Sequence, residues 1–179
     1  MKISADILKK AKNVQIFASD IDGVLTGGEI VILGDCSEIK IWNVRDGLGY
    51  SFMSKVEPKI ITAWITGRES DAVKARAESF EIDYLIQGCA DKNYALETIL
   101  KETGCKISQV AYIGDDIIDI PVLKKAGFSV CPKDACDEVK EVVDFVSSYN
   151  GGKGVARETI EIILKAKGEW DKILKKYGK

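Results

Sequence analysis

Two carboxylates separated by one residue, Asp20 and Asp22, directly follow an apolar segment at 14–18. Polar groups at the carboxyl end of a buried strand lie where open α/β sheets hold their ligands. One such carboxylate can act as a nucleophile while the other transfers protons. Gly23 then allows the backbone to turn sharply and approach a substrate. An Asp-rich turn without a catalytic role has the same local pattern. The interpretation therefore depends on which other polar residues lie at the same edge of the sheet.

Three further polar groups follow predicted strands, directly or after a short loop. They are Thr66, Lys92 and the pair Asp115 and Asp116. If the strands are parallel neighbours, all of these groups meet at one edge of the sheet. Each alone could be an ordinary turn or helix cap, but their joint occurrence favours a site. A cation in the first turn of a helix is unfavourable, so Lys92 is expected to have a specific partner.

The residue types suggest a role for each group. Asp20, with a reference pKa of about 3.9, is ionised at neutral pH and can attack phosphorus. Asp22 is placed to protonate a leaving alcohol and then to activate the water that hydrolyses an aspartyl phosphate. Asp20, Asp115 and the main-chain carbonyl of Asp22 offer the oxygen ligands that Mg²⁺ prefers. Thr66 and nearby backbone N–H groups can hold phosphate oxygens, and Lys92 balances the negative charge.

Composition removes several classes of function. The chain has no histidine, which excludes Ser-His-Asp hydrolases, Cys-His proteases and His-ligated zinc enzymes. A net charge of -2 suggests neither a nucleic-acid nor an anionic-membrane partner. No apolar stretch approaches the roughly 18 residues of a membrane span, so we expect a cytoplasmic protein. The five cysteines match no zinc signature and are expected to be reduced, small apolar side chains.

The elements that must position these groups alternate along the chain. Strands are expected at 14–19, 60–65, 84–87, 110–113, 128–130 and 145–146, and helices at 4–12, 47–56, 70–80, 92–103, 118–125, 135–142 and 155–167. This alternation predicts an α/β fold with a parallel sheet and right-handed crossovers. Gly34 and Asp35, between short strands at 29–33 and 38–42, predict an inserted hairpin. We expect one domain over 1–179, with a hairpin flap at about 27–43 and a helical tail at about 155–179.

The polar groups lie in four motifs that resemble those of the haloacid dehalogenase superfamily. The motifs are DIDGVLT at 20–26, ITGR at 65–68, Lys92, and GDDIID at 114–119. The resemblance implies a Rossmann-like fold whose central parallel sheet is flanked by helices, without a cap domain. In this superfamily a second Asp in the first motif, here Asp22, marks phosphatases. The resemblance gives Asp116 and Asp119 supporting roles.

Four further segments, at 38–47, 66–70, 87–92 and 151–158, are more specifically similar to the 3-deoxy-D-manno-octulosonate 8-phosphate (KDO 8-phosphate) phosphatase family. The similarity implies a Mg²⁺-dependent phosphomonoesterase of KDO and lipopolysaccharide biosynthesis. It also implies a homotetramer assembled by the hairpins, in which a neighbouring subunit helps to cover the active site. Arginine suits a sugar acid because its guanidinium binds a carboxylate through two parallel hydrogen bonds. The residues expected to contact substrate are Asp22, Asn43, Val44, Arg45, Asp46, Gly47, Thr66, Gly67, Arg68, Arg76 and Lys92.

Alternatives remain at this point. The substrate could be the nine-carbon analogue 2-keto-3-deoxynononate 9-phosphate, although relatives of that kind lack the arginine found here at Arg68. A broader sugar-phosphate phosphatase is also consistent with the motifs. A non-catalytic oligomerisation module is disfavoured because the catalytic set is intact. Ser51 stands where some members have a basic residue, and Arg76 on its helix could instead be a solvated side chain.

Overall fold

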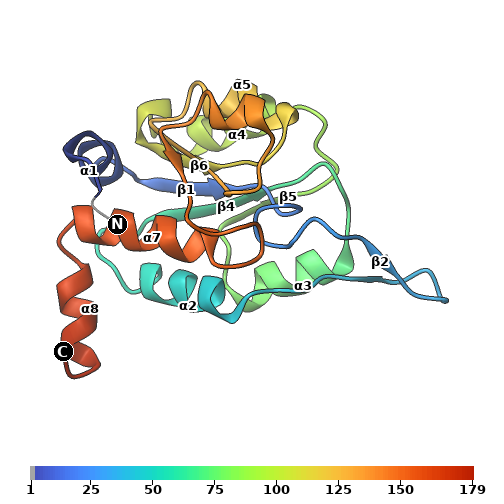
Figure 1. The fold of residues 1–179 in the computed structure, drawn as a ribbon, viewed down its shortest axis with the longest axis horizontal. Coiled ribbons are helices and arrows are strands. Elements are labelled where there is room, and N and C mark those ends of the chain that lie inside the picture. Colours follow the sequence, from blue (N-terminus) through green and yellow to red (C-terminus); the bar gives the residue numbers. More distant parts are fainter. Residues whose placement is uncertain (1–2) are drawn as a thin grey trace.

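A six-stranded parallel sheet lies between two layers of helices in the computed structural model, which describes residues 3–179 (Figure 1). The strand order is β5-β4-β1-β6-β7-β8, and every neighbouring pair is parallel. The strands are β1 (Ile16–Ser19), β4 (Ile61–Ile65), β5 (Tyr84–Ile86), β6 (Val110–Ile113), β7 (Phe128–Cys131) and β8 (Phe145–Val146). The chain runs from β1 outward to β4 and β5 and returns on the other side of β1 as β6. Ligands of open α/β sheets bind outside such a reversal of strand order.

The helices divide between the two faces of the sheet. One face packs against α1 (Ala5–Lys12), α2 (Val44–Met53), α3 (Asp71–Ser79) and α7 (Val155–Ala166), and the other against α4 (Lys92–Thr103), α5 (Ile120–Leu123) and α6 (Asp137–Lys140). Side chains alternate between these layers along each strand, so that Phe17 packs on the first and Ile16 on the second. Strands buried on both faces are what the continuous apolar runs predict, and the parallel sheet is confirmed.

Three predicted helices differ from the structure by more than one residue at an end. The helix expected at 47–56 is α2, and it begins at Val44 because the side chain of Asn43 caps it, accepting a hydrogen bond from the N–H of Arg45 at 2.8 Å. The segment expected as one helix at 118–125 is a 3₁₀ turn, η2 (Ile117–Asp119), followed by α5. A second 3₁₀ turn, η1 (Ile107–Gln109), precedes β6, and the helix expected at 135–142 is the shorter α6.

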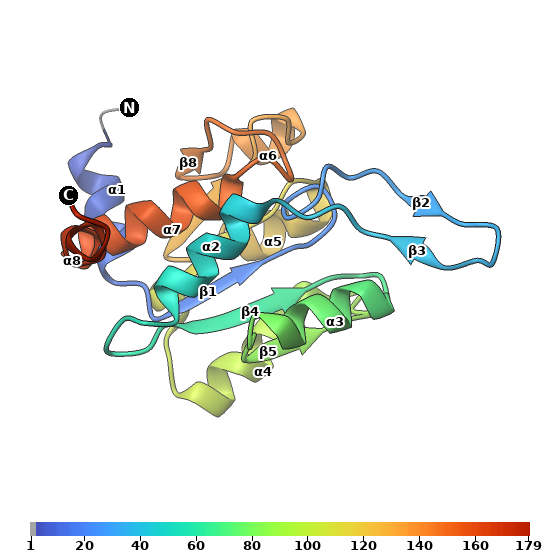
Figure 2. The ribbon, with the colours of Figure 1, turned by 90° about the horizontal axis from the view of Figure 1, so that it is seen from below.

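The hairpin extends away from the sheet, as Figure 2 makes clear. Its paired strands, β2 (Val31–Ile32) and β3 (Glu38–Ile39), are antiparallel and shorter than predicted. Apolar side chains on it face solvent, with Ile32 64% exposed and Ile41 68% exposed. Cys36 near its turn is also exposed, so the interpretation of every cysteine as an apolar filler is wrong for this one. Surface this apolar on a projecting element is typical of an interaction site.

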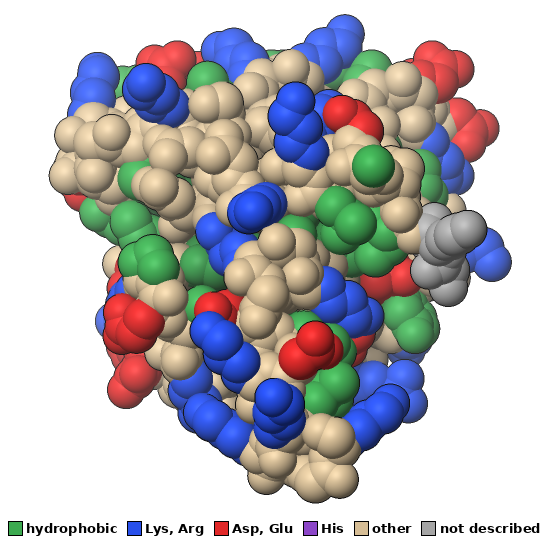
Figure 3. Space-filling view, turned by 90° about the vertical axis from the view of Figure 1, so that its left-hand side faces the viewer, with side chains coloured by type: hydrophobic (Ala, Val, Ile, Leu, Met, Phe, Trp, Pro, Cys, Tyr) green, Lys and Arg blue, Asp and Glu red, His purple; other side chains and the backbone are tan. Residues whose placement is uncertain are grey.

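The chain ends in α8 (Trp170–Lys176), which follows α7 at the end of the molecule opposite the hairpin. Lys and Arg side chains are interspersed there with Asp and Glu, which is typical of a solvated helix face (Figure 3). Within residues 3–179, no helix has the length and apolar character needed to cross a lipid bilayer.

Candidate active site

The loop after β1 places the first motif at the reversal of strand order. Asp20 is 6% exposed, and its Oδ1 accepts a hydrogen bond from the N–H of Ile21 at 2.6 Å. Gly23 has φ +81, a conformation that side chains with a Cβ rarely adopt. A Cβ built at Gly23 would overlap the carboxylate of Asp115, so the glycine is what allows that carboxylate to lie against the loop.

Lys92 lies in the first turn of α4 because its ammonium group is bound by two carboxylates. Its Nζ donates to Asp20 Oδ2 at 2.6 Å and to Asp119 Oδ1 at 2.7 Å, and the residue is 4% exposed. The side chain of Asp91 caps α4 by accepting from the N–H groups of Asn93 and Tyr94, which offsets the unfavourable position of the cation. The predicted pairing of Lys92 with charge around Asp20 is therefore present in the structure.

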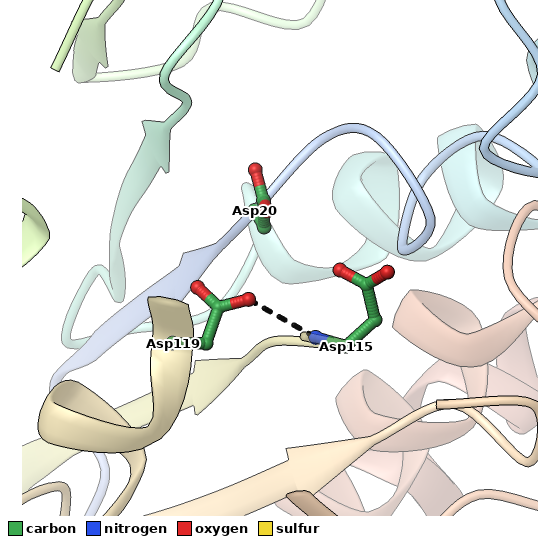
Figure 4. Close-up of side chains that lie close together, drawn as sticks. All are labelled: Asp20, Asp115 and Asp119. Atoms are coloured by element: carbon green, nitrogen blue, oxygen red, sulfur yellow. Dashed lines mark hydrogen bonds between the residues drawn. The ribbon is translucent and has the colours of Figure 1, made fainter. Parts of the chain in front are cut away.

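Three carboxylates gather beside this lysine. Asp20, Asp115 and Asp119 each bring an oxygen to within 4.8 Å of the others (Figure 4). Burial first, and then the charges of Asp20 and Asp119, raise the pKa of Asp115 to about 7. Burial also raises the pKa of Asp20 to about 6, because it outweighs the attraction of Lys92. The cluster holds more negative charge than one ammonium group neutralises.

Both carboxylate oxygens of Asp119 accept hydrogen bonds from other groups of the protein. Oδ1 accepts from Lys92 and from the buried Tyr112 hydroxyl at 2.8 Å, and Oδ2 accepts from the backbone N–H groups of Asp115 and Asp116 at 3.1 and 3.4 Å. Among the described residues, none donates a hydrogen bond to the carboxylate of Asp115. Asp119 is thus placed to support the loop, while Asp115 keeps its oxygens available. Asp116 is exposed and caps η2.

Thr66 directly follows β4 and is 2% exposed. Its Oγ1 accepts a hydrogen bond from the N–H of Arg68 at 3.3 Å, and its carbonyl accepts from the N–H of Cys89 at 3.1 Å. These bonds curl the segment Thr66–Gly67–Arg68 at the same sheet edge as Asp20, just before α3. The strand-end groups predicted from the sequence are therefore brought to one edge.

Asp22 lies in an ion-pair network that sequence reasoning missed. Its Oδ1 pairs with Nζ of Lys40, which also lies 2.6 Å from Glu38 Oε1. The other oxygen of Glu38 accepts from Nη2 of Arg68 at 2.7 Å, and Arg68 Nε lies 3.9 Å from Asp22 Oδ2. A signal was present in the alternation of Ile39, Lys40 and Ile41, which puts the lysine on the opposite side of the strand from its apolar neighbours.

The remaining predicted substrate residues lie in two groups. Asn43, Asp46, Gly47 and Arg76 line one small cavity beside aromatic side chains. The guanidinium of Arg76 stacks over Phe80 at 4.0 Å from the ring centroid, burial lowers its pKa, and its buried Nε has no hydrogen-bond acceptor. Val44 and Arg45 are instead exposed on α2.

The carboxylate of Asp46 has a structural partner. Its Oδ1 accepts a hydrogen bond from the backbone N–H of Arg157 at 2.8 Å, in the first turn of α7. Burial raises the pKa of Asp46 to about 6. The position of this carboxylate explains how α7 begins without a side-chain cap at Gly154. A contact of Asp46 with substrate stays a prediction.

Comparison with known proteins agrees with this geometry. A family model described as haloacid dehalogenase-like hydrolase matches residues 51–158. The 3-deoxy-D-manno-octulosonate 8-phosphate phosphatase of Escherichia coli strain K12 is 37% identical over 169 residues, covering 94% of this chain and 89% of the relative. The chain therefore belongs to the haloacid dehalogenase-like hydrolases, and within them to the family of the 3-deoxy-D-manno-octulosonate 8-phosphate phosphatases.

Solved structures give the same result. The phosphatase of this name from Moraxella catarrhalis, crystallised with a magnesium ion, a phosphate ion and KDO, has a TM-score of 0.94 and 37% identity, covering 98% of this chain and 99% of that one. The Yersinia pestis phosphatase has a TM-score of 0.91 and 36% identity, covering 94% and 90%. These similarities extend over the first motif and the hairpin, which precede the segment matched by the family model.

Proposed function

We propose that this protein is a Mg²⁺-dependent phosphomonoesterase that hydrolyses KDO 8-phosphate to the free sugar acid and phosphate. One observation carries the proposal: Asp20 is held by Lys92 at a cluster of carboxylates, in a chain 37% identical to KDO 8-phosphate phosphatases over 94% of its length. The proposal makes the protein a cytoplasmic enzyme of KDO and lipopolysaccharide biosynthesis.

The donor set at the cluster fits a hard divalent cation. Carboxylate oxygens are the ligands that Mg²⁺ prefers, and burial together with the charges of Asp20 and Asp119 raises the pKa of Asp115, an effect that a bound cation would oppose. Asp20, Asp115 and the main-chain carbonyl of Asp22 would hold the ion. When bound, it reduces the repulsion between the anionic nucleophile and the anionic substrate phosphate.

The side chains support phosphoryl transfer in two steps. Asp20 attacks phosphorus, the bond from phosphorus to the sugar oxygen breaks, and Asp22 gives its proton to that oxygen. Water then attacks the aspartyl phosphate, Asp22 takes a proton from the water, and the bond from phosphorus to Asp20 breaks. Lys92 keeps Asp20 in position and offsets its charge, and Thr66 offers a hydroxyl to the phosphate.

Two arginines support recognition of the sugar acid. The side chain of Arg68 is 44% exposed beside Asp22, and Arg76 lacks an ion-pair partner among the described residues. Guanidinium groups bind carboxylates with two parallel hydrogen bonds, so these residues suit a 2-keto carboxylate. Asn43 and Gly47 line the same small cavity as Arg76, and the proposal assigns them to substrate binding by similarity to the family.

The same proposal includes assembly into a homotetramer through the hairpins. The exposed apolar side chains of β2 and β3 support it, because an isolated chain would leave them in water. A neighbouring subunit would then cover part of the site.

Phosphate release tests the proposed function directly. The purified protein should release phosphate from KDO 8-phosphate much faster than from the nine-carbon analogue or from glucose 6-phosphate, and EDTA should abolish the activity until Mg²⁺ is restored. Equal rates on all three substrates would favour a broader phosphatase. No release from any of them with Mg²⁺ would reject catalysis and favour an assembly role.

A further inference from the structure

Lys40 is a hairpin lysine whose ammonium group is buried beside Asp22. Its side chain is 1% exposed, whereas its neighbours Ile39 and Ile41 are 42% and 68% exposed. This is the reverse of the usual arrangement, in which apolar side chains are buried and charged side chains are exposed. Lysine is almost never fully buried unless it is paired, so this burial calls for an explanation in terms of its partners.

The partners of Lys40 are two carboxylates of different kinds. Glu38 is held from two sides, by Lys40 and by Arg68, which together keep its pKa below the usual range. Asp22 depends on Lys40 alone for a close contact, because Arg68 Nε is 3.9 Å away. Among the described residues, no other group hydrogen-bonds the Asp22 carboxylate. Lys40 is thus the group that fixes where this carboxylate points.

We propose that Lys40 is a positioning residue that holds the Asp22 carboxylate in the orientation for proton transfer to the leaving oxygen. The inference rests on the role of Asp22 in the proposed function. The Asp22 side chain is 21% exposed in a loop, so without Lys40 it would be free to turn into solvent. Catalytic groups need positions fixed within a fraction of an ångström, which a neighbour with its own fixed contacts supplies. Glu38 gives Lys40 that second contact.

The leaving group provides a readout specific to this role. When the bond from phosphorus to oxygen breaks, a poor leaving group such as phenolate or a sugar alkoxide needs the proton of Asp22, whereas p-nitrophenolate leaves well without it. The constant kcat/KM reports the steps up to formation of the aspartyl phosphate. Phenyl phosphate and p-nitrophenyl phosphate both lack a carboxylate, so changes at Arg68 affect the two alike.

The experiment compares kcat/KM of Lys40→Met and wild type on these two substrates with Mg²⁺. We expect a loss of about 10- to 100-fold on phenyl phosphate and a loss several-fold smaller on p-nitrophenyl phosphate. Lys40→Arg keeps the charge and should recover most of the difference. Lys59→Met, which removes an ammonium group paired with Asp83 before β4, is the matched control and should change neither value.

A loss of equal size on both substrates in Lys40→Met would overturn the positioning role. Asp22→Asn, measured in parallel, tests the premise separately. Equal losses in Asp22→Asn would reject proton transfer by Asp22, whereas a leaving-group dependence in Asp22→Asn that is absent in Lys40→Met would reject only the role of Lys40. If Lys40→Met does not fold, Lys40→Gln replaces it with the same expected pattern.

Discussion

Replacing Asp115 with Asn is expected to stabilise the metal-free protein at alkaline pH, although it removes a proposed metal ligand. Burial and the neighbouring carboxylates raise the pKa of Asp115 from 3.8 to about 7. The folded protein therefore keeps a proton that the unfolded chain has already lost, so its stability falls as the pH rises from about 4 to about 7. Asn carries no charge at any of these pH values, so the variant does not lose stability in this way as the pH rises.

The magnitude follows from the size of the shift. One pKa unit corresponds to about 1.4 kcal/mol, so a change from 3.8 to about 7 amounts to at most about 4 kcal/mol. Asp115 is partly exposed, and water screens the repulsion, so we expect about 2 kcal/mol for Asp115→Asn at pH 8. For a chain of 179 residues this corresponds to a rise in Tm of about 4–8 °C. At pH 5 the rise in Tm should be less than half as large, because pH 5 lies less than halfway between the unfolded pKa of 3.8 and the folded pKa of about 7.

Thermal unfolding in EDTA at pH 5 and pH 8 measures this difference, and a repeat with Mg²⁺ tests the site itself. Mg²⁺ should raise the Tm of the wild type and not that of Asp115→Asn, since a ligand stabilises the state that binds it. Asp6→Asn, whose side chain is 74% exposed at the N-terminal end of α1, is a control expected to change the Tm little and by the same amount at both pH values. A variant less stable than wild type at pH 8 in EDTA, or a Tm difference that is the same at both pH values, would refute the reasoning.

Three further outcomes are expected. Asp20→Asn should lower kcat by at least about 10³-fold while substrate binding persists in calorimetry, and near-normal turnover would reject an aspartyl phosphate. Arg68→Ala should raise KM about 10-fold or more for KDO 8-phosphate and little for p-nitrophenyl phosphate, since only the former has a carboxylate; equal changes would remove Arg68 from its recognition. Ile32→Asp should shift the protein to smaller species in sedimentation, because it places a charge on the exposed apolar hairpin, and an unchanged sedimentation coefficient would count against assembly there.

The sequence predicted well those features that depend on local pattern. The helix α4 was expected at its observed bounds. In the structure the side chain of Asp91 caps its start, and Gly104, with φ +70, ends it. The convergence of Asp20, Thr66 and Asp115 was expected if the strands are parallel neighbours, and β4, β1 and β6 are adjacent parallel strands. Such features need no knowledge of distant partners.

Features set by distant contacts could not be predicted in the same way. The carboxylate of Asp46 finds its partner 111 residues later, at Arg157. The burial of Lys40 depends on the base of the hairpin lying against the first motif, where Lys40 pairs with Asp22. The alternation of apolar residues gives the two sides of a strand without saying which one faces the protein. An exposed apolar side is stable only if another surface covers it, and one sequence does not identify that surface.

The pair of tryptophans at the base of the hairpin provides an intrinsic fluorescence signal for the position of the hairpin. The indole of Trp42, just after β3, stacks on that of Trp64 in β4, with ring centroids 5.7 Å apart and an interplanar angle of 12°. Trp64 is fixed by donating its indole N–H to the Tyr50 hydroxyl at 2.8 Å. A swing of the hairpin would separate the two indoles and change their ultraviolet emission, whereas Trp170, at the far end on α8, would give a steady background. The emission spectrum thus tests, without an attached dye, whether the hairpin moves during turnover.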